Sequence, residues 1–239
     1  MELSIQRLTC AYGKRQVLHD ISVDALRSGE VIAVIGPNAA GKSTLFRCLA
    51  GLTRYQGVVS IDGVDTRTMK RTQVNRKIAY MPQDNLANVR MTVFEAVLLS
   101  LQVNAAWRVS DEDLDRVHRT LDALGITHLA LRGLNELSGG QRQMVSIGQA
   151  LVRQPDAIIL DEPTNNLGVE ETHGVLRFVR NARDSGHSCI FIAHNIHHVF
   201  EVVDRIVVLR RGEVVADDID PKQFTVQKVE EVITGMRVM

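Results

Sequence analysis

Short apolar runs separated by polar turns occupy the first third of the chain. Gln16–Ala25 carries apolar residues at alternate positions, which predicts a strand with one buried face. Val31–Ile35 is a continuous apolar run, the pattern of a strand buried on both faces, and a glycine-rich turn follows it. A helix is expected next, from Lys42 to Ala50. The other strands expected in this part are Leu3–Thr9, Val58–Ile61 and Lys77–Met81.

The pattern changes between Thr92 and Val152, where helical spacing replaces strand alternation. Ser110 and Asp113 resemble a capping box, and the apolar stripe that follows stops at Gly125. Strands are expected again at Ala157–Leu160, Cys189–Ala193 and Arg205–Leu209. We therefore predict a single α/β domain whose core is formed by residues 1–85 and 155–239, with residues 86–154 as an inserted helical lobe.

Charge and composition narrow the possible functions. The chain of 239 residues has 28 basic and 28 acidic side chains, and 4% of its residues are aromatic. A zero net charge with few aromatic residues argues against a nucleic-acid partner, because such binders rely on a basic field or on stacking platforms. The apolar runs are too short to span a bilayer, so we expect a soluble, cytoplasmic protein that serves any membrane process by docking to a partner.

The three cysteines, Cys10, Cys48 and Cys189, lie far apart in the sequence. Their odd number and wide spacing argue against a disulfide framework. We expect them to be small buried hydrophobic side chains in a reducing compartment.

Residues 36–44 read GPNAAGKST and match the phosphate-binding pattern G-x-x-x-x-G-K-[ST]. Glycines let the backbone turn its N–H groups toward phosphate oxygens, and the helix that follows adds its positive N-terminal end. Lys42 would reach the terminal phosphates, and the Ser43 hydroxyl would bind Mg²⁺. A chance match is the plainer explanation, but the strand before the loop and the helix after it argue against chance. The candidate nucleotide-binding residues are Gly36, Pro37, Asn38, Ala39, Ala40, Gly41, Lys42, Ser43 and Thr44.

A second candidate element is the buried strand Ala157–Leu160, which ends in Asp161 and Glu162. An acid at the end of such a strand can hold Mg²⁺ through its water shell, which is the role we expect of Asp161. Glu162 could then accept a proton from an attacking water. A solvated acidic turn would fit the same residues, but the phosphate-binding loop makes the functional interpretation the better one.

A third element, LSGGQ, comprises Leu137 and the candidate nucleotide-binding residues Ser138, Gly139, Gly140 and Gln141. A serine cap followed by two glycines at the start of a helix forms another anion-binding N-terminus. An ordinary capped helix explains these residues equally well. If both elements bind phosphate, one solution is a head-to-tail pair in which each nucleotide lies between Gly36–Thr44 of one copy and Ser138–Gln141 of the other.

Together these motifs resemble the nucleotide-binding subunit of ABC transporters over essentially the whole chain. The resemblance implies a P-loop NTPase (RecA-like) core with an antiparallel β subdomain and an inserted α-helical subdomain. It implies that Tyr12 stacks on adenine, that Gln83 contacts Mg²⁺ beside the helical lobe, and that His194 senses the γ-phosphate. By the same resemblance Asp161 is the metal-associated acid and Glu162 the catalytic base, with Lys42, Gln83 and His194 completing the catalytic set.

The same resemblance implies ATP and Mg²⁺ as cofactors. It also implies a homodimer, or a paired cassette, with two shared ATP sites, which docks to transmembrane permease subunits on the cytoplasmic face of the cell membrane. A solute-binding protein would be an indirect partner. Three positions depart from the family pattern. Ala39 replaces a glycine and is expected to stiffen the loop, Gly168 replaces an aspartate that crosses the dimer interface, and Asn195 replaces the aspartate after the histidine.

The subfamily indications are mixed. AYGKRQVLHDIS, LFRCLAGL and LSGGQRQMVSIGQALVRQPD are similar to importers of ferric siderophores, haem and cobalamin, which is the assignment we favour. LGVEETHGVL and the ending VITGM resemble monosaccharide importer ATPases instead. Soluble cassette ATPases of DNA repair or translation carry long insertions or tandem cassettes that do not fit this length. A non-hydrolysing regulatory module would not need Glu162, Gln83 and His194 together.

Overall fold

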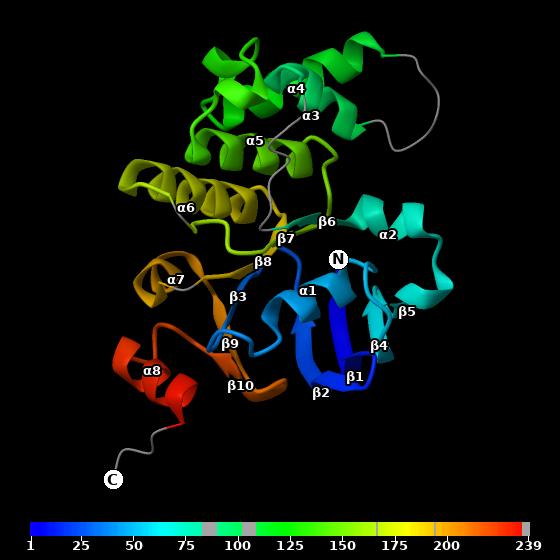
Figure 1. The fold of residues 1–239 in the computed structure, drawn as a ribbon, viewed down its shortest axis with the longest axis vertical. Helices are drawn as coiled ribbons and strands as arrows, with labels where there is room; N and C mark the ends of the chain where they lie inside the picture. Colours follow the sequence, from blue (N-terminus) through cyan, green and yellow to red (C-terminus); the bar gives the residue numbers. More distant parts are fainter. Residues whose placement is uncertain (83–89, 102–108, 166, 194, 236–239) are drawn as a thin grey trace.

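The structure is a computed structural model that describes residues 1–82, 90–101, 109–165, 167–193 and 195–235. Its strands form two sheets, and a group of helices gathers at the end of the molecule farthest from the antiparallel sheet (Figure 1). This is the α/β fold predicted from the apolar pattern, including the antiparallel sheet and the helical insertion implied by the family resemblance. The phosphate-binding loop lies where the two sheets meet.

The smaller sheet has four strands in the order β2-β1-β4-β5, all antiparallel. Its long first hairpin turns at Gly13 and Lys14, so that Tyr12 at the end of β1 pairs with Arg15 at the start of β2. β1 runs three residues beyond the predicted Leu3–Thr9, and β2 exceeds the predicted Gln16–Ala25 by one residue at each end. The strands are β1 (Leu3–Tyr12), β2 (Arg15–Leu26), β4 (Gln56–Ile61) and β5 (Val64–Asp65).

The larger sheet has six strands in the order β10-β9-β3-β8-β7-β6. They are parallel except for the edge strand β10, which pairs antiparallel with β9. Because parallel strands end at the same edge, the residues that follow β3 and β7 emerge on one side of the molecule. The strands are β3 (Val31–Ile35), β6 (Ile78–Met81), β7 (Ala157–Leu160), β8 (Ser188–Ile192), β9 (Arg205–Arg210) and β10 (Glu213–Ile219).

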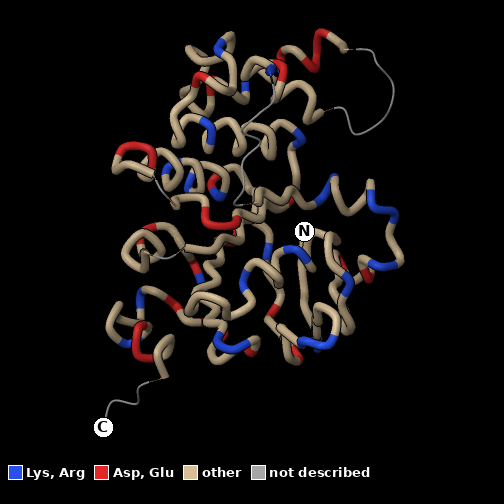
Figure 2. The backbone as a smooth tube through the Cα atoms, viewed as in Figure 1, with Lys and Arg blue, Asp and Glu red and all other residues tan. Residues whose placement is uncertain are grey.

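The helices divide into those against the sheets and those that form the insertion. Figure 1 shows α3, α4 and α5 together at the top of the view, with α6 between them and the strands. The short helices η1 (Thr66–Thr68) and α2 (Arg71–Lys77) lie on the opposite side of the molecule from α6, and Figure 2 shows a local run of Lys and Arg there. The remaining helices are α1 (Lys42–Leu49), α3 (Val93–Leu101), α4 (Asp111–Ala123), η2 (Thr127–Leu129), η3 (Leu134–Glu136), α5 (Gly139–Leu151), α6 (Val169–Asp184), α7 (Ile196–Val202) and α8 (Val226–Thr234).

The parallel sheet separates two apolar cores. On β3, Val31, Ala33 and Ile35 pack toward α3–α7, whereas Ile32 and Val34 pack toward α1 and the antiparallel sheet. A strand that is buried on both faces reads as a continuous apolar run, which is why β3 and β7 were predicted with their observed bounds. Burial of each such side chain contributes about 1.5–3 kcal/mol, so the strand is held firmly under the loop that follows it.

Local sequence signals in the helical part are confirmed. Ser110 caps α4 by accepting a hydrogen bond from the Asp113 backbone, and Asp113 accepts one from the Ser110 backbone in return. The helix ends where Gly125 adopts a φ of 69°. The three cysteines are buried and free, as expected. Within the described ranges, no helix has the length and apolar character needed to cross a bilayer.

Candidate nucleotide site

The loop after β3 has a backbone that only glycine can adopt at two positions. Gly36 has a φ of 151°, and a Cβ there would overlap the Leu209 carbonyl oxygen of β9. Gly41 has a φ of 104°, and a Cβ there would lie 2.7 Å from Leu18 Cδ2. Both conformations are in the region that favours glycine. The glycine pattern found in the sequence is therefore explained by positive φ at both ends of the loop and by the close approach of the Leu209 backbone to Gly36 and of the Leu18 side chain to Gly41.

The turn between β9 and β10 supports this loop from outside. The Gly212 N–H donates to the Ala40 carbonyl oxygen at 2.9 Å, next to the contact between Gly36 and Leu209. On the other side of the turn, Arg210 Nη1 donates to the Val232 carbonyl oxygen in α8 at 3.5 Å. Main-chain contacts therefore join the loop to the β9–β10 turn, and the Arg210 side chain joins β9 to α8.

Four side chains, those of Lys42, Ser43, Tyr80 and Asp161, lie where the loop faces the end of β7. The Lys42 ammonium donates to the Gly36 and Pro37 carbonyl oxygens at 2.7 and 3.0 Å. Ser43 Oγ donates to Asp161 Oδ1 at 3.0 Å, and the Tyr80 hydroxyl donates to Asp161 Oδ2 at 3.1 Å. Lys42 begins α1 after β3, and Asp161 directly follows β7, so both groups lie at the edge where the parallel strands end.

Burial makes this cluster receptive to ions of both signs. Desolvation lowers the pKa of Lys42, while the negative charges of Glu162 and Asp161 act in the opposite direction. Burial likewise raises the pKa of Asp161, against the hydrogen bonds from Ser43 and Tyr80. An anion beside Lys42 and a cation beside Asp161 would each compensate a desolvated charge.

Glu162 lies beside the loop in a conformation that is uncommon for a side chain of its size. Its φ is 55°, and the Asn165 amide nitrogen donates to Glu162 Oε2 at 3.0 Å. The Asn165 backbone N–H also donates to the Glu162 carbonyl oxygen at 3.1 Å. A non-glycine residue in the left-handed region is a candidate for a functional position. Asn165 thereby fixes both the turn and the orientation of the carboxylate.

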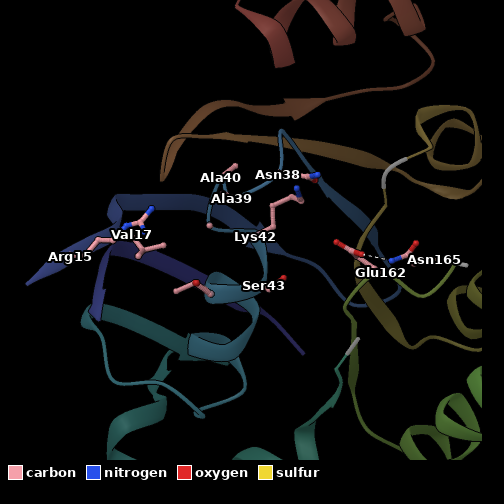
Figure 3. A pocket seen from close by; sticks show the side chains of 11 residues that line it. Arg15, Val17, Asn38, Ala39, Ala40, Lys42, Ser43, Glu162 and Asn165 are labelled. Atoms are coloured by element: carbon pink, nitrogen blue, oxygen red, sulfur yellow. Dashed lines mark hydrogen bonds between the residues drawn. The ribbon is translucent and has the colours of Figure 1, made fainter. Parts of the chain in front are cut away.

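These groups surround an open cavity of about 640 Å³ (Figure 3). The cavity brings together seven of the nine predicted loop residues with Glu162. Three lining residues were not predicted, namely Arg15 and Val17 from β2 and Asn165 from the turn after β7. The spacing of Asn165 three residues after Glu162 was a usable signal, because such turns often hold a side-chain hydrogen bond. The cavity is lined by Arg15, Val17, Asn38, Ala39, Ala40, Gly41, Lys42, Ser43, Thr44, Glu162 and Asn165.

The Ser138–Gln141 element lies apart from this cavity and lines none of its described surface. Ser138 caps α5, with Oγ accepting from the Gln141 N–H at 3.1 Å and Gln141 Oε1 accepting from the Ser138 N–H at 3.0 Å. Ser138 and Gly139 are exposed, whereas Gly140 is buried beneath the Glu171 side chain. A Cβ on Gly140 would overlap Glu171 Cγ, so only glycine leaves room for this contact between α5 and α6.

The residues that were assigned roles by family resemblance differ in where the structure places them. Tyr12 is 48% exposed at the β1–β2 turn and is not a lining residue of the cavity. Gln83 and His194 lie outside the described residues. Asn195 caps α7 by accepting from the His197 N–H at 3.0 Å, and Gly168 precedes α6 beside Glu171. Ala39 has a φ of 61°, a conformation that glycine adopts more readily.

The donor set fits Mg²⁺ bound mainly by phosphate and water. Ser43 Oγ and Asp161 Oδ1 are hard oxygen ligands that already lie 3.0 Å apart. Among the described residues, no group of three or more His, Cys, Asp and Glu side chains could hold a metal by itself. Mg²⁺ usually takes one or two protein oxygens together with substrate phosphates and several waters, so this sparse set is appropriate.

Comparison with known proteins identifies the family. The model of the family described as "ABC transporter" matches residues 18–165. An uncharacterized ABC transporter ATP-binding protein of Methanocaldococcus jannaschii is 36% identical over 91% of this chain and 85% of its own length. A sulfate/thiosulfate import ATP-binding protein of Rhizobium meliloti is 35% identical, over 90% of this chain and 59% of its own. A petrobactin import ATP-binding protein of Bacillus anthracis is 30% identical, over 99% and 88%.

The fold comparison agrees. A crystal structure of an ATP-binding cassette of an ABC transporter in its ADP conformation superposes with a TM-score of 0.85 at 25% identity, covering 99% of this chain and 96% of that one. The chain therefore belongs to the ABC transporter family. It is an ATP-binding cassette with ATPase activity, as the motifs predicted.

Proposed function

We propose that Gly36–Thr44 holds the triphosphate of ATP and that Ser43 and Asp161 hold Mg²⁺ with it. The backbone N–H groups of the loop and the N-terminus of α1 supply partial positive charge, and Lys42 adds a full charge. Binding would draw the Lys42 ammonium away from the Gly36 and Pro37 carbonyl oxygens that it contacts now. When bound, Mg²⁺ neutralises charge on the terminal phosphates.

Hydrolysis is assigned to Glu162 as general base. Its carboxylate accepts a proton from water, the water oxygen bonds to the γ-phosphorus, and the bond from that phosphorus to the bridging oxygen breaks. ADP keeps the bridging oxygen and phosphate departs. Asn165 keeps the Glu162 carboxylate oriented through its 3.0 Å hydrogen bond. Gln83 and His194 remain the predicted metal contact and γ-phosphate sensor on the family resemblance.

The Ser138 hydroxyl supports the proposal that two copies of the chain form a dimer. Its oxygen accepts from the Gln141 N–H, and within the described part of the chain its proton has no acceptor. A hydroxyl can donate while it accepts, so it can still bind an anion. The cavity has no Ser138–Gln141 residue of its own. We infer that a second copy supplies this element to the γ-phosphate, in a head-to-tail dimer with two shared sites.

The work of this dimer is solute import. In this proposal the helical lobe predicted at residues 86–154 moves against the core predicted at residues 1–85 and 155–239 when hydrolysis removes the γ-phosphate between the two copies. Permease subunits receive this motion at the cytoplasmic face of the cell membrane, and a solute-binding protein acts on the far side. The relatives named for import support this role.

The transported solute is assigned to the ferric siderophore class or a related iron- or cobalamin-type solute. The petrobactin import relative, which matches 99% of this chain, supports that assignment. The test is co-expression with candidate permeases, followed by measurement of which binding protein and solute stimulate ATP hydrolysis. Stimulation only by a monosaccharide or sulfate system would replace the solute while leaving the ATPase assignment intact.

The ATPase and dimer are tested together with Glu162→Gln. Hydrolysis should fall about 10²–10⁴-fold because the amide cannot accept a proton. The ATP-bound variant should form a long-lived dimer by light scattering, whereas Lys42→Ala should stay monomeric because it binds ATP poorly. Wild-type turnover would remove Glu162 as the base, and an ATP-bound monomer at concentrations well above the ATP affinity would refute the shared site. Mixing Lys42→Ala with Ser138→Arg should restore some activity through the one intact site.

A further inference from the structure

Arg15 is a cation in the nucleotide cavity that the phosphate-binding motif does not explain. It begins β2 after the Gly13–Lys14 turn, and it lines the cavity with its guanidinium beside Val17 (Figure 3). The side chain is exposed and, within the described residues, makes no hydrogen bond or ion pair. An Arg that lines a ligand cavity without a protein partner is available to the ligand.

The direction of β2 shows which end of the ligand reaches Arg15. The Val17 carbonyl oxygen would lie 3.4 Å from a Cβ on Gly41, so Val17 adjoins the phosphate-binding loop. Arg15 is two residues earlier on β2, beyond a register shift between Gln16 and Leu18, and it lines the same cavity. A nucleotide whose phosphates occupy Gly41–Ser43 must therefore pass Val17 before it reaches Arg15. The group that arrives at Arg15 is the nucleoside.

The chemistry of the two residues agrees with this direction. Lys42, the loop N–H groups and the α1 N-terminus already face the phosphates. A guanidinium is planar, delocalised and weakly hydrated, so it stacks well on aromatic rings, and Val17 adds an apolar surface beside it. Building on the proposed ATP site, we propose that Arg15 stacks its guanidinium on the purine ring of the bound nucleotide. Stacking uses the ring face and not its edge, so it favours purine nucleotides without distinguishing adenine from guanine.

Tyr12 provides the internal comparison. It pairs with Arg15 across the hairpin, so both side chains emerge on the same face of the sheet. Tyr12 does not line the cavity, however, whereas Arg15 does. The Arg15 contact is thus distinct from the Tyr12 stacking implied by family resemblance, and each can be removed separately.

The experiment compares ligands with and without a nucleoside. Wild-type protein, Arg15→Ala, Arg15→Lys, Tyr12→Ala and the control Lys14→Ala are titrated with ATP, GTP and inorganic tripolyphosphate, each with Mg²⁺. Arg15→Ala should raise the Kd for ATP and GTP by about 3- to 30-fold and leave the Kd for tripolyphosphate unchanged. Arg15→Lys should be intermediate, and Lys14→Ala should bind like wild type because Lys14 lies outside the cavity. KM for ATP should rise while kcat is retained.

Two results would overturn the assignment. An equal loss of tripolyphosphate affinity in Arg15→Ala would place the guanidinium on the phosphates, and an unchanged Kd for ATP would mean that it makes no contact. Lys42→Ala tests the ATP site independently of Arg15, because this substitution should weaken the binding of ATP, GTP and tripolyphosphate alike. If Lys42→Ala binds ATP like wild type, the site proposal fails; if only Arg15→Ala does, the stacking proposal alone fails. Circular dichroism confirms that each variant is folded.

Discussion

Replacing Ala39 by glycine should stabilise the protein, although glycine substitutions usually destabilise. The Ala40 N–H donates to the Pro37 carbonyl oxygen at 3.2 Å, which closes a turn with Asn38 and Ala39 at its centre. Ala39 has a φ of 61°, whereas Asn38 is not among the described positive-φ residues. A turn with positive φ only at its third residue favours glycine or asparagine there. The exposed Ala39 methyl group contributes little packing to offset its unfavourable backbone conformation.

The expected magnitude follows from two opposing terms. The left-handed conformation costs a residue with a Cβ about 1–2 kcal/mol, and glycine removes that cost. Glycine also loses about 0.5–1 kcal/mol more conformational freedom on folding. The net gain in the free energy of unfolding should be about 0.5–1 kcal/mol, equivalent to a rise in Tm of about 1–4 °C for a chain of this size. Urea and thermal unfolding of nucleotide-free protein would measure it.

Asn38→Gly is the matched control, because it adds the entropy cost without removing strain. It should lower the unfolding free energy by up to about 1 kcal/mol. The two variants should therefore shift stability in opposite directions. If both substitutions change the free energy of unfolding in the same direction, or if Ala39→Gly is the less stable variant, the positive φ at Ala39 does not destabilise the protein.

Two further predictions concern other parts of the site. Gly140→Ala should displace the Glu171 side chain and lower the unfolding free energy by about 1–3 kcal/mol. In a protein that already carries Glu171→Ala, Gly140→Ala should cost much less, and a double-mutant cycle of unfolding free energies would measure the difference. Additive losses would mean that the two side chains do not meet. Ser43→Ala removes the hydroxyl that contacts Asp161, so half-maximal hydrolysis should require a higher Mg²⁺ concentration, and an unchanged Mg²⁺ titration would exclude Ser43 as a ligand.

The elements predicted best from sequence are those whose pattern is set by local burial. β3 and β7 are buried on both faces, so their apolar runs coincide with the strands. β10 was missed because an edge strand with one partner, carrying Asp217 and Asp218, has no clear alternation of buried and exposed residues. The short helix α2 was also missed, since it buries only Val74 and thus leaves no apolar stripe.

The same distinction applies to the site. The phosphate-binding loop and the acids after β7 were predictable because each is contiguous in sequence. The contribution of Arg15 and Val17 was not, because it depends on how the antiparallel sheet packs against the loop, at Leu18 and Gly41. The two helix starts proposed to bind anions were predicted as separate elements, and Ser138–Gln141 do not line the cavity of their own chain.

The β9–β10 turn contacts both the phosphate-binding loop and α8. A change at α8 can therefore alter nucleotide affinity from a distance. Arg210 connects α8 to the strand whose Leu209 carbonyl oxygen touches Gly36, and the Gly212 N–H reaches Ala40 two residues farther along the turn. A protein that binds α8, or a domain fused to it, would shift the loop relative to β9 without contacting the nucleotide site. Affinity tags are best placed away from this helix, and a ligand that binds α8 and lowers the affinity for ATP would itself bind less tightly when ATP is bound.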